Sequence, residues 1–247
     1  MKDYVYEEQQ LGVMSRAAIV KKPDPAMFLI PGFGTVQPGA NVRSTGLYGQ
    51  LGKRVVDILL VLMIAPIAVP VVALCALLMW REGGSPFYRQ DRLGQNGDRF
   101  SILKLRTMVR NADARLEAYL QENPAMRAEW DATQKLKEDP RITARGRFLR
   151  ATSLDELPQL WNVIKGDMSL VGPRPMLPEQ LPLYGNAQAY FALKPGITGE
   201  WQVSARNETR FDYRAKLDAG YLDNLTLGQD VGILMRTVGV VLRRTGY

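Results

Sequence analysis

The pattern of apolar and polar positions is dominated by one run, Ile58 to Trp80, which contains no charged residue. A straight helix over this run would be roughly 34 Å long, enough to cross a hydrocarbon core of ~30 Å. Pro66 and Pro70 lie near its middle, and each removes a backbone donor and clashes with a carbonyl one turn earlier. The pattern therefore predicts a long apolar helix with a bend at these prolines.

Basic residues flank both ends of the apolar run. They are Arg43, Lys53 and Arg54 before it, and Arg81, Arg89, Arg92 and Arg99 after it. Because Lys and Arg accumulate on the cytoplasmic side of membranes, we expect both ends there. A re-entrant helix that enters one leaflet and returns meets this expectation. A kinked helix that crosses once is the main alternative, and a buried hairpin of a soluble protein is a weaker one.

A second apolar pattern lies near the C-terminus, with arginines toward the other face of the predicted helix. The apolar residues are Val231, Leu234, Met235, Val238, Val241 and Leu242, and the arginines are Arg236, Arg243 and Arg244. Such a helix can lie in the plane of the lipid headgroups. The same spacing also fits a terminal helix that packs on a core.

Shorter elements are predicted between these two patterns. Pro86–Gln90 and Arg99–Leu105 read as strands joined through Asn96-Gly97, a hairpin signal. The pattern turns helical from about Met108. Asn123-Pro124 then predicts the start of a second helix toward Lys137, which Asp139-Pro140 ends.

Composition narrows the possible chemistry. Lys and Arg outnumber Asp and Glu by 32 to 25, giving a net charge of +7, which favours nucleic acid, anionic lipid or a phosphorylated substrate as partner. The chain has no histidine, which excludes Ser-His-Asp triads and His-ligated zinc. Cys75 is the only cysteine, which excludes a disulfide framework and a cysteine-based metal site.

Candidate chemistry is concentrated between Arg150 and Pro175, where two adjacent carboxylates, Asp155 and Glu156, stand among arginines. Acids beside guanidinium groups suggest phosphate chemistry on a metal. Ser153 to Glu156 also fits a capping box, which would make the acids structural. Pro158 would clash in a helix capped by Ser153, so we expect the helix to start near Asp155, with the pair at its N-terminus.

The turn Gly172-Pro173-Arg174-Pro175 carries the second part of the candidate site. Prolines on both sides of Arg174 limit backbone freedom, which suits an arginine that presents a planar fork to phosphate. A loop with an incidental surface arginine is the alternative.

At these residues the chain resembles the bacterial sugar transferase family, the monotopic phosphoglycosyl transferases. The matching strings are KRVVD (53–57), FYRQDRLGQNG (87–97), KLRTM (104–108), DPRIT (139–143), TSLDELPQLWNVIKGDMSLVGPRP (152–175), KPGITGEWQVSARN (194–207) and RRTGY (243–247). Two positions depart from the family pattern, Ala65 before the bending proline and Ala205 in the SARN string. The likeness is strongest to enzymes that initiate exopolysaccharide synthesis with galactose or glucose 1-phosphate.

The resemblance implies roles for individual residues. Asp155 would be the nucleophile that forms a phosphosugar intermediate, and Glu156 would hold Mg²⁺. Pro66, with Pro70, would bend a re-entrant membrane helix. The expected phosphate- and substrate-binding residues are Arg150, Arg174, Arg147, Lys104, Arg106 and Arg206.

The resemblance also implies the organisation and the partners. We expect an α+β fold: a mostly helical cytoplasmic catalytic domain over residues 83–247 with a short β-hairpin and interfacial amphipathic helices, a re-entrant membrane helix over 51–82, and an N-terminal extension of unassigned role over 1–50. The expected substrates are a UDP-hexose and undecaprenyl phosphate at the cytoplasmic face of the bacterial inner membrane. No nucleic-acid motif is present, and a homo-oligomer is compatible with the sequence. The alternatives are a basic membrane-tethered binding protein and a Mg²⁺-dependent phosphatase.

Overall fold

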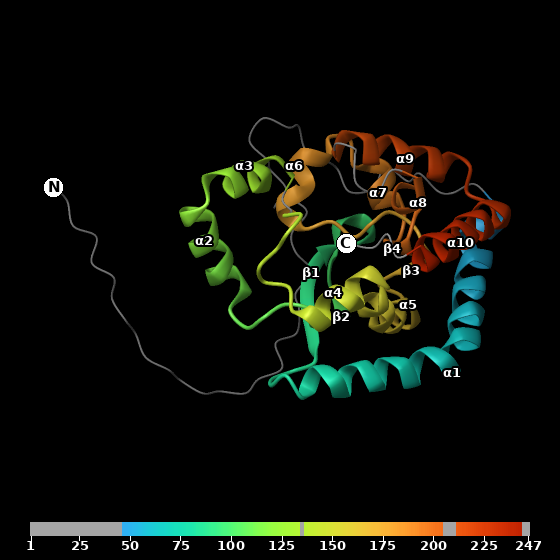
Figure 1. The fold of residues 1–247 in the computed structure, drawn as a ribbon. Coiled ribbons are helices and arrows are strands. Elements are labelled where there is room, and N and C mark those ends of the chain that lie inside the picture. Colours follow the sequence, from blue (N-terminus) through green and yellow to red (C-terminus); the bar gives the residue numbers. More distant parts are fainter. Residues whose placement is uncertain (1–45, 134–135, 205–210, 244–247) are drawn as a thin grey trace, which may run out of the picture. The chain divides into compact units, whose positions relative to one another are not determined.

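The computed structural model describes residues 46–133, 136–204 and 211–243, all within one compact unit, Gln37–Tyr247. Most of these residues are helical, and the strands form one antiparallel and one parallel pair (Figure 1). The expected α+β class, mostly helical with a short hairpin, is confirmed. The parallel pair is a feature that the sequence pattern does not indicate. Most of the N-terminal extension, and Arg206, lie outside the described residues.

The apolar run forms α1, Lys53–Trp80, which follows a π-helical turn, η2, Tyr48–Gly52. Among the described residues, one helix, Tyr48–Trp80, is long and apolar enough to cross a membrane by length and composition. Pro66 and Pro70 lie inside α1, and Figure 1 shows that the helix bends sharply part-way along its length. Proline removes a helical hydrogen bond, which gives a physical cause for the bend.

The predicted hairpin is confirmed. β1, Phe87–Leu93, pairs antiparallel with β2, Arg99–Leu105, so the first strand extends three residues beyond the predicted end at Gln90. Asn96 and Gly97 have φ angles of 57° and 81°, the left-handed conformation that an Asn-Gly turn supplies with little strain. Pairing of Leu93 with Arg99 at the end of the ladder accounts for the extra length.

Two helices follow the hairpin. α2 spans Ala112–Glu122 and α3 spans Pro124–Thr133, so the predicted start of the second helix at Pro124 is confirmed. Met108 is not helical, because it forms a bridge with Ile142. A small apolar cluster of Leu116, Leu120 and Leu136 holds this pair of helices together.

The remaining elements follow along the chain and include the parallel strand pair. They are α4 (Ala144–Ala151), the 3₁₀ helix η4 (Leu154–Gln159), α5 (Leu160–Lys165), β3 (Ser169–Val171), η5 (Pro178–Gln180), α6 (Leu181–Tyr184), α7 (Gln188–Ala192), β4 (Gly196–Thr198), α8 (Glu200–Ser204), α9 (Phe211–Asp223) and α10 (Leu227–Leu242). β3 pairs parallel with β4, with Ser169 opposite Gly196 and Val171 opposite Thr198.

The main core joins the first turns of α1 to the rest of the unit. Val61 of α1 packs with Ile102 of β2, Val163 of α5 and Ile233 of α10, and all four are fully or almost fully buried. Asp57 of α1 is also buried, and its Oδ1 accepts a hydrogen bond from the backbone N–H of Leu170 at 3.1 Å. The N-terminal part of α1 is therefore a component of the core.

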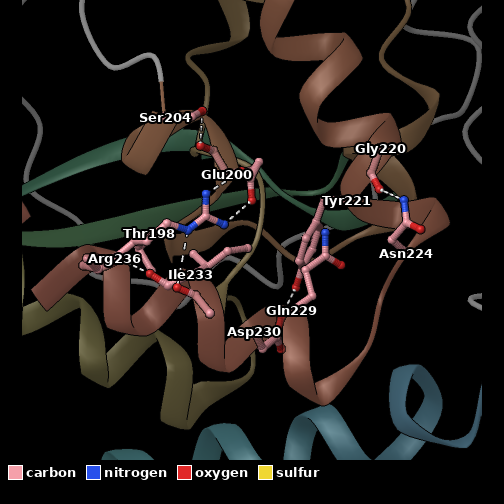
Figure 2. Close-up of polar contacts among 12 residues, drawn as sticks. Thr198, Glu200, Ser204, Gly220, Tyr221, Asn224, Gln229, Asp230, Ile233 and Arg236 are labelled. Carbon is pink, nitrogen blue, oxygen red and sulfur yellow. Dashed lines mark hydrogen bonds and ion pairs between the residues drawn. The ribbon is translucent and has the colours of Figure 1, made fainter. Parts of the chain in front are cut away.

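One face of α10 is tied to the core by polar contacts (Figure 2). Arg236 donates two hydrogen bonds of 2.8 Å to the Glu200 carboxylate, and Thr237 Oγ1 lies 2.7 Å from Thr198 Oγ1. Another face of α10 is exposed and apolar; it comprises Leu227, Val231, Met235, Val238 and Leu242. The interpretation as a helix that packs on the core is therefore confirmed for one face, and the open apolar face leaves a position at lipid headgroups as a prediction.

Candidate active site

The acid pair lies on η4, immediately after α4. Ser153 has a left-handed backbone, with φ of 57°, and its side chain forms no capping hydrogen bond. The capping box is therefore wrong. The helical segment starts at Leu154, one residue before the expected start, and both acids lie in its first turn, so the expected position of the pair is confirmed, although the turn is 3₁₀ and not α-helical. Pro158 is accommodated inside η4 because a 3₁₀ helix bonds residues three apart, so the carbonyl of Leu154 is not directed at residue 158. The α-helix begins only at Leu160, after the acids.

Glu156 is held among cations. Its Oε1 lies 2.6 Å from Lys104 Nζ, on β2, and 3.7 Å from Arg174 Nη2, in the proline-flanked turn. Lys104 and Arg174 are thus brought together from segments far apart in the chain. The arrangement places the Gly172–Pro175 turn directly beside the acid pair, as the sequence predicts for a phosphate site.

Asp155 is almost buried, with 7 % of its surface exposed. Burial, together with the neighbouring Glu156 charge, raises the pKa of its carboxyl to about 6, although Lys104 and Arg150 oppose the rise. Near neutral pH the carboxylate form therefore predominates, but it is poorly solvated. A poorly solvated carboxylate next to cations is suited to attack an electrophile.

An open pocket adjoins the acid pair; Glu156 lines it, and Asp155 does not. Its lining residues are Arg92, Ile102, Lys104, Glu156, Gln159, Arg174, Pro175 and Ile197. Three of these side chains are cationic and one is a carboxylate, so the pocket carries a positive balance. Such a lining fits an anionic ligand that carries phosphate.

The other expected binding residues divide into two groups. Arg150 lies near the pair: its Nε donates to Thr107 Oγ1 at 2.9 Å, and its charge favours the ionised form of Asp155. Arg106 instead donates to the carbonyl of Gly83 at 2.6 Å, just beyond the end of α1, and Arg147 is exposed on α4. Neither of these two lines the pocket, and Arg206 lies outside the described residues.

Comparison with known proteins gives the family. A family model described as bacterial sugar transferase matches residues 48–244. The chain belongs to the bacterial sugar transferase family. The resemblance inferred from the motifs is thus confirmed, and so, at the level of the family, is the prediction of a transferase.

Several relatives of this family member have informative names. It is 48 % identical over 195 residues to a UDP-galactose-lipid carrier transferase of Erwinia amylovora, covering 78 % of this chain and 41 % of the relative. It is 49 % identical over 195 residues to an undecaprenyl-phosphate galactose phosphotransferase of Salmonella typhimurium, with the same coverage. The exopolysaccharide production protein ExoY of Sinorhizobium fredii is 42 % identical, over 81 % of this chain and 89 % of the relative. The chain thus spans less than half of the first two relatives and most of the third.

The site of this sugar transferase offers few carboxylates that could bind Mg²⁺. Mg²⁺ commonly takes one or two carboxylates and completes its shell with water and substrate phosphates. Glu156 offers a carboxylate in the pocket, and Asp155 lies next to it. The described residues contain no group of three or more His, Cys, Asp or Glu that could hold an ion. The residues therefore fit an ion that is shared with a bound diphosphate.

Four lining residues of the sugar transferase site are not predicted from the sequence: Arg92, Ile102, Gln159 and Ile197. Arg92 lies in a matching string, but from the sequence it reads only as a basic residue that flanks the apolar run. Its position at the pocket follows from the hydrogen bond between Leu93 N–H and the Met176 carbonyl, at 3.0 Å. That contact joins segments more than eighty residues apart, so no local pattern in the sequence predicts it.

Proposed function

We propose that the protein transfers a hexose 1-phosphate from a UDP-sugar to undecaprenyl phosphate, as the first step in the synthesis of an exopolysaccharide or another glycoconjugate. The observation that carries the proposal is the almost buried Asp155 beside a pocket acid, Glu156, in a cationic pocket. The relatives named for undecaprenyl-phosphate sugar transfer support it. Their names include both galactose and glucose, the two hexoses expected from the sequence.

In the first step, a carboxylate oxygen of Asp155 attacks the sugar-side phosphorus of the UDP-hexose. The bond from this phosphorus to the bridging oxygen breaks, and UMP leaves with the electron pair. Lys104 and Arg174 lie where they can bind the phosphate under attack. Mg²⁺, when bound at Glu156, would neutralise charge on the diphosphate. The product on the enzyme is an acyl phosphate that carries the sugar.

In the second step, a phosphate oxygen of undecaprenyl phosphate attacks the phosphorus of this acyl phosphate. The bond between phosphorus and the Asp155 oxygen breaks, which regenerates the carboxylate and yields a lipid-linked sugar diphosphate. An acyl phosphate is reactive enough to make this second transfer feasible, so one difficult displacement becomes two easier ones. No general base is needed, because the attacking phosphate is already anionic.

A membrane location follows from the lipid acceptor and is supported by exposed apolar surface. Many apolar side chains of α1 are exposed, including Leu59, Met63 and Ile67, and α10 adds its own exposed apolar face. Phe148 of α4 and Trp161 of α5 are also more than half exposed. We assign α1, within residues 51–82, as a re-entrant helix bent at Pro66 and Pro70 in the bacterial inner membrane. Residues 83–247 would form the catalytic domain on the cytoplasmic face of this membrane, with α10 as an interfacial helix.

The experiment that tests the proposal follows UMP and lipid-linked sugar with purified protein in lipid nanodiscs. Wild-type protein with UDP-galactose or UDP-glucose, Mg²⁺ and undecaprenyl phosphate should release UMP and form lipid-linked product in equal amounts. Asp155→Asn should do neither, even in a single turnover. An Asp155→Asn variant that still releases UMP would contradict covalent catalysis by Asp155.

The same assay separates the alternatives. Formation of free sugar phosphate in place of lipid-linked product would indicate a phosphatase. Wild-type protein that releases no UMP from any UDP-sugar, but retains DNA in a salt-sensitive manner, would indicate a basic binding protein. Arg147→Gln serves as the control variant, because Arg147 is exposed and does not line the pocket.

A further inference from the structure

Arg92 is a buried cation of the pocket whose described partners are all neutral. Its Nη1 donates to the carbonyl of Pro175 at 3.2 Å, and its Nη2 donates to Gln90 Oε1 at 2.5 Å. Its Nε is buried and has no hydrogen-bond partner among the described residues. No carboxylate in the described part of the chain forms an ion pair with this guanidinium. Arg92 therefore lacks a counter-ion of its own.

The surroundings make this position costly for a cation. Burial lowers the pKa of Arg92 to about 10, and the adjacent Arg174 contributes to the decrease. The pKa of Arg214 is also lowered to about 10, by burial and by Arg174, and its guanidinium lies 3.8 Å from the centroid of the Trp201 ring. The guanidinium groups of Arg92 and Arg214 thus both lie near that of Arg174. Among the described residues, Glu156 is the one carboxylate that lines the pocket, and it forms ion pairs with Lys104 and Arg174 and not with Arg92.

A structural role alone does not account for the charge. The two hydrogen bonds to the neutral oxygens of Pro175 and Gln90 need donors, and a neutral donor could supply them with less desolvation. A buried guanidinium is stabilised when an anion completes its hydrogen bonds, and phosphate oxygens match its planar fork. The pocket therefore offers two cationic positions, one beside Glu156 and one at Arg92.

We propose that Arg92 binds the phosphate that remains with uridine and departs as UMP, while Lys104 and Arg174 face the sugar-side phosphate beside the acids. This assignment rests on the proposed function, because it takes a nucleoside diphosphate sugar as the ligand. It makes Arg92 a binding residue for the leaving group. Because Nη1 also holds the Pro175 carbonyl, the same side chain links the bound phosphate to the turn that carries Arg174.

The test compares the binding of UMP and of uridine to the full chain in lipid nanodiscs, by calorimetry with Mg²⁺ present. Arg92→Gln should weaken UMP binding about 10- to 100-fold, the usual effect of losing a charge-assisted hydrogen bond. It should leave uridine binding within about twofold, because the nucleoside carries no phosphate. Arg89→Gln is the matched control: it lies on the same strand, on the opposite face, and is exposed.

Arg92→Lys keeps the charge but loses Nε and the fork, so UMP binding should fall about three- to tenfold. Wild-type affinity for UMP in Arg92→Lys and Arg92→Gln would overturn the assignment of Arg92, and so would an equal loss of UMP and uridine binding. If Arg92→Gln does not fold, Arg92→Lys decides alone. Wild-type protein that neither binds UMP nor releases it from a UDP-sugar would instead contradict the proposed function, and the Arg92 assignment with it.

Discussion

Two buried aspartates, Asp155 and Asp230, lie beside lysines in this molecule, and their surroundings differ. Asp230, 3 % exposed, accepts hydrogen bonds from Tyr48 Oη at 2.6 Å, Lys53 Nζ at 2.6 Å and Tyr221 Oη at 2.5 Å. Asp155 is also almost buried, but among the described residues no other side chain donates a hydrogen bond to it.

The difference separates a structural carboxylate from a reactive one. The oxygens of Asp230 are occupied by protein donors. The contact with Tyr221 joins α10 to α9 (Figure 2), and the contact with Lys53 joins α10 to the start of α1. Asp155 has nearby cations and an adjacent pocket, and the hydrogen bond that its carboxylate accepts comes from its own backbone N–H. Burial by itself therefore does not identify a functional acid; the absence of dedicated donors beside a pocket does.

The largest predicted effect is on activity. Asp155→Asn should lower turnover by more than about 10³-fold, because an amide cannot form the acyl phosphate. Asp230→Asn, the matched change at the other aspartate, should leave turnover per folded molecule within about threefold. The measurement is UMP release, normalised to the folded fraction. Similar losses in the two variants would remove the distinction between the two acids.

The second effect is on stability, and here the large loss is expected at Asp230. Asp230→Asn leaves the buried Lys53 charge without its carboxylate, which should lower the free energy of unfolding by about 3 kcal/mol. The midpoint of denaturant unfolding in mild detergent measures this change. Arg127→Gln breaks the exposed Glu117 pair and should cost less than about 1 kcal/mol, which makes it the control. A loss of the same size in both variants would argue against a special role of the Asp230 contacts.

The third effect concerns the stability cost of Asp155 itself. Its pKa rises on folding from the ordinary value of 3.8 to about 6, so the folded state binds the proton more tightly than the unfolded state. Stability therefore falls as pH rises from about 4 to 6 and levels off above that. At pH 7 the free energy of unfolding of Asp155→Asn should be roughly 2–3 kcal/mol higher than that of wild type. This difference should vanish below about pH 4. A pH-independent difference would contradict this account.

A smaller effect should appear in the pH dependence of the wild-type rate. If the ionised Asp155 is the nucleophile, as proposed, the rate of UMP release in a single turnover should fall about tenfold per pH unit below pH 6. Above pH 7 it should be flat with respect to this group. A rate that stays constant down to pH 4.5 would mean that the reactive carboxyl does not have the raised pKa.

The smallest effect tests one donor to Asp230. Tyr221→Phe removes one hydrogen bond and leaves the Lys53 and Tyr48 contacts in place, so unfolding should become easier by about 1 kcal/mol. Tyr213→Phe, at an exposed position on the same helix, is the control and should have no measurable effect. Equal effects at both tyrosines would show that the contact with Asp230 contributes nothing.

Local signals in the sequence were sufficient for several features. The Asn96-Gly97 turn predicts the hairpin because these residues tolerate positive φ, and Pro124 predicts a helix start because its missing donor costs nothing there. The adjacent acids and the proline-flanked Arg174 identify the candidate site because their charges stand close together in the sequence. Each signal depends on a few neighbouring residues.

Features that depend on distant contacts could not be read from the sequence. Lys104 reaches Glu156 from a strand 52 positions away, and Arg92 reaches the pocket through contacts with Pro175, 83 positions away. The three-residue strands β3 and β4 are too short to give a periodic signal. The 3₁₀ form of η4 has no local signal, because Pro158 is compatible both with the first turn of an α-helix and with a 3₁₀ helix.

The most direct test of the distinction between Asp155 and Asp230 is to trap the intermediate. Protein in nanodiscs is mixed with Mg²⁺ and the UDP-hexose, without undecaprenyl phosphate, then quenched in acid, digested and weighed by mass spectrometry. The peptide that contains Asp155 should gain the mass of one hexose phosphate, in proportion to the UMP released, and the peptide that contains Asp230 should be unchanged. UMP release without any adduct on Asp155, or an adduct on another residue, would contradict the account.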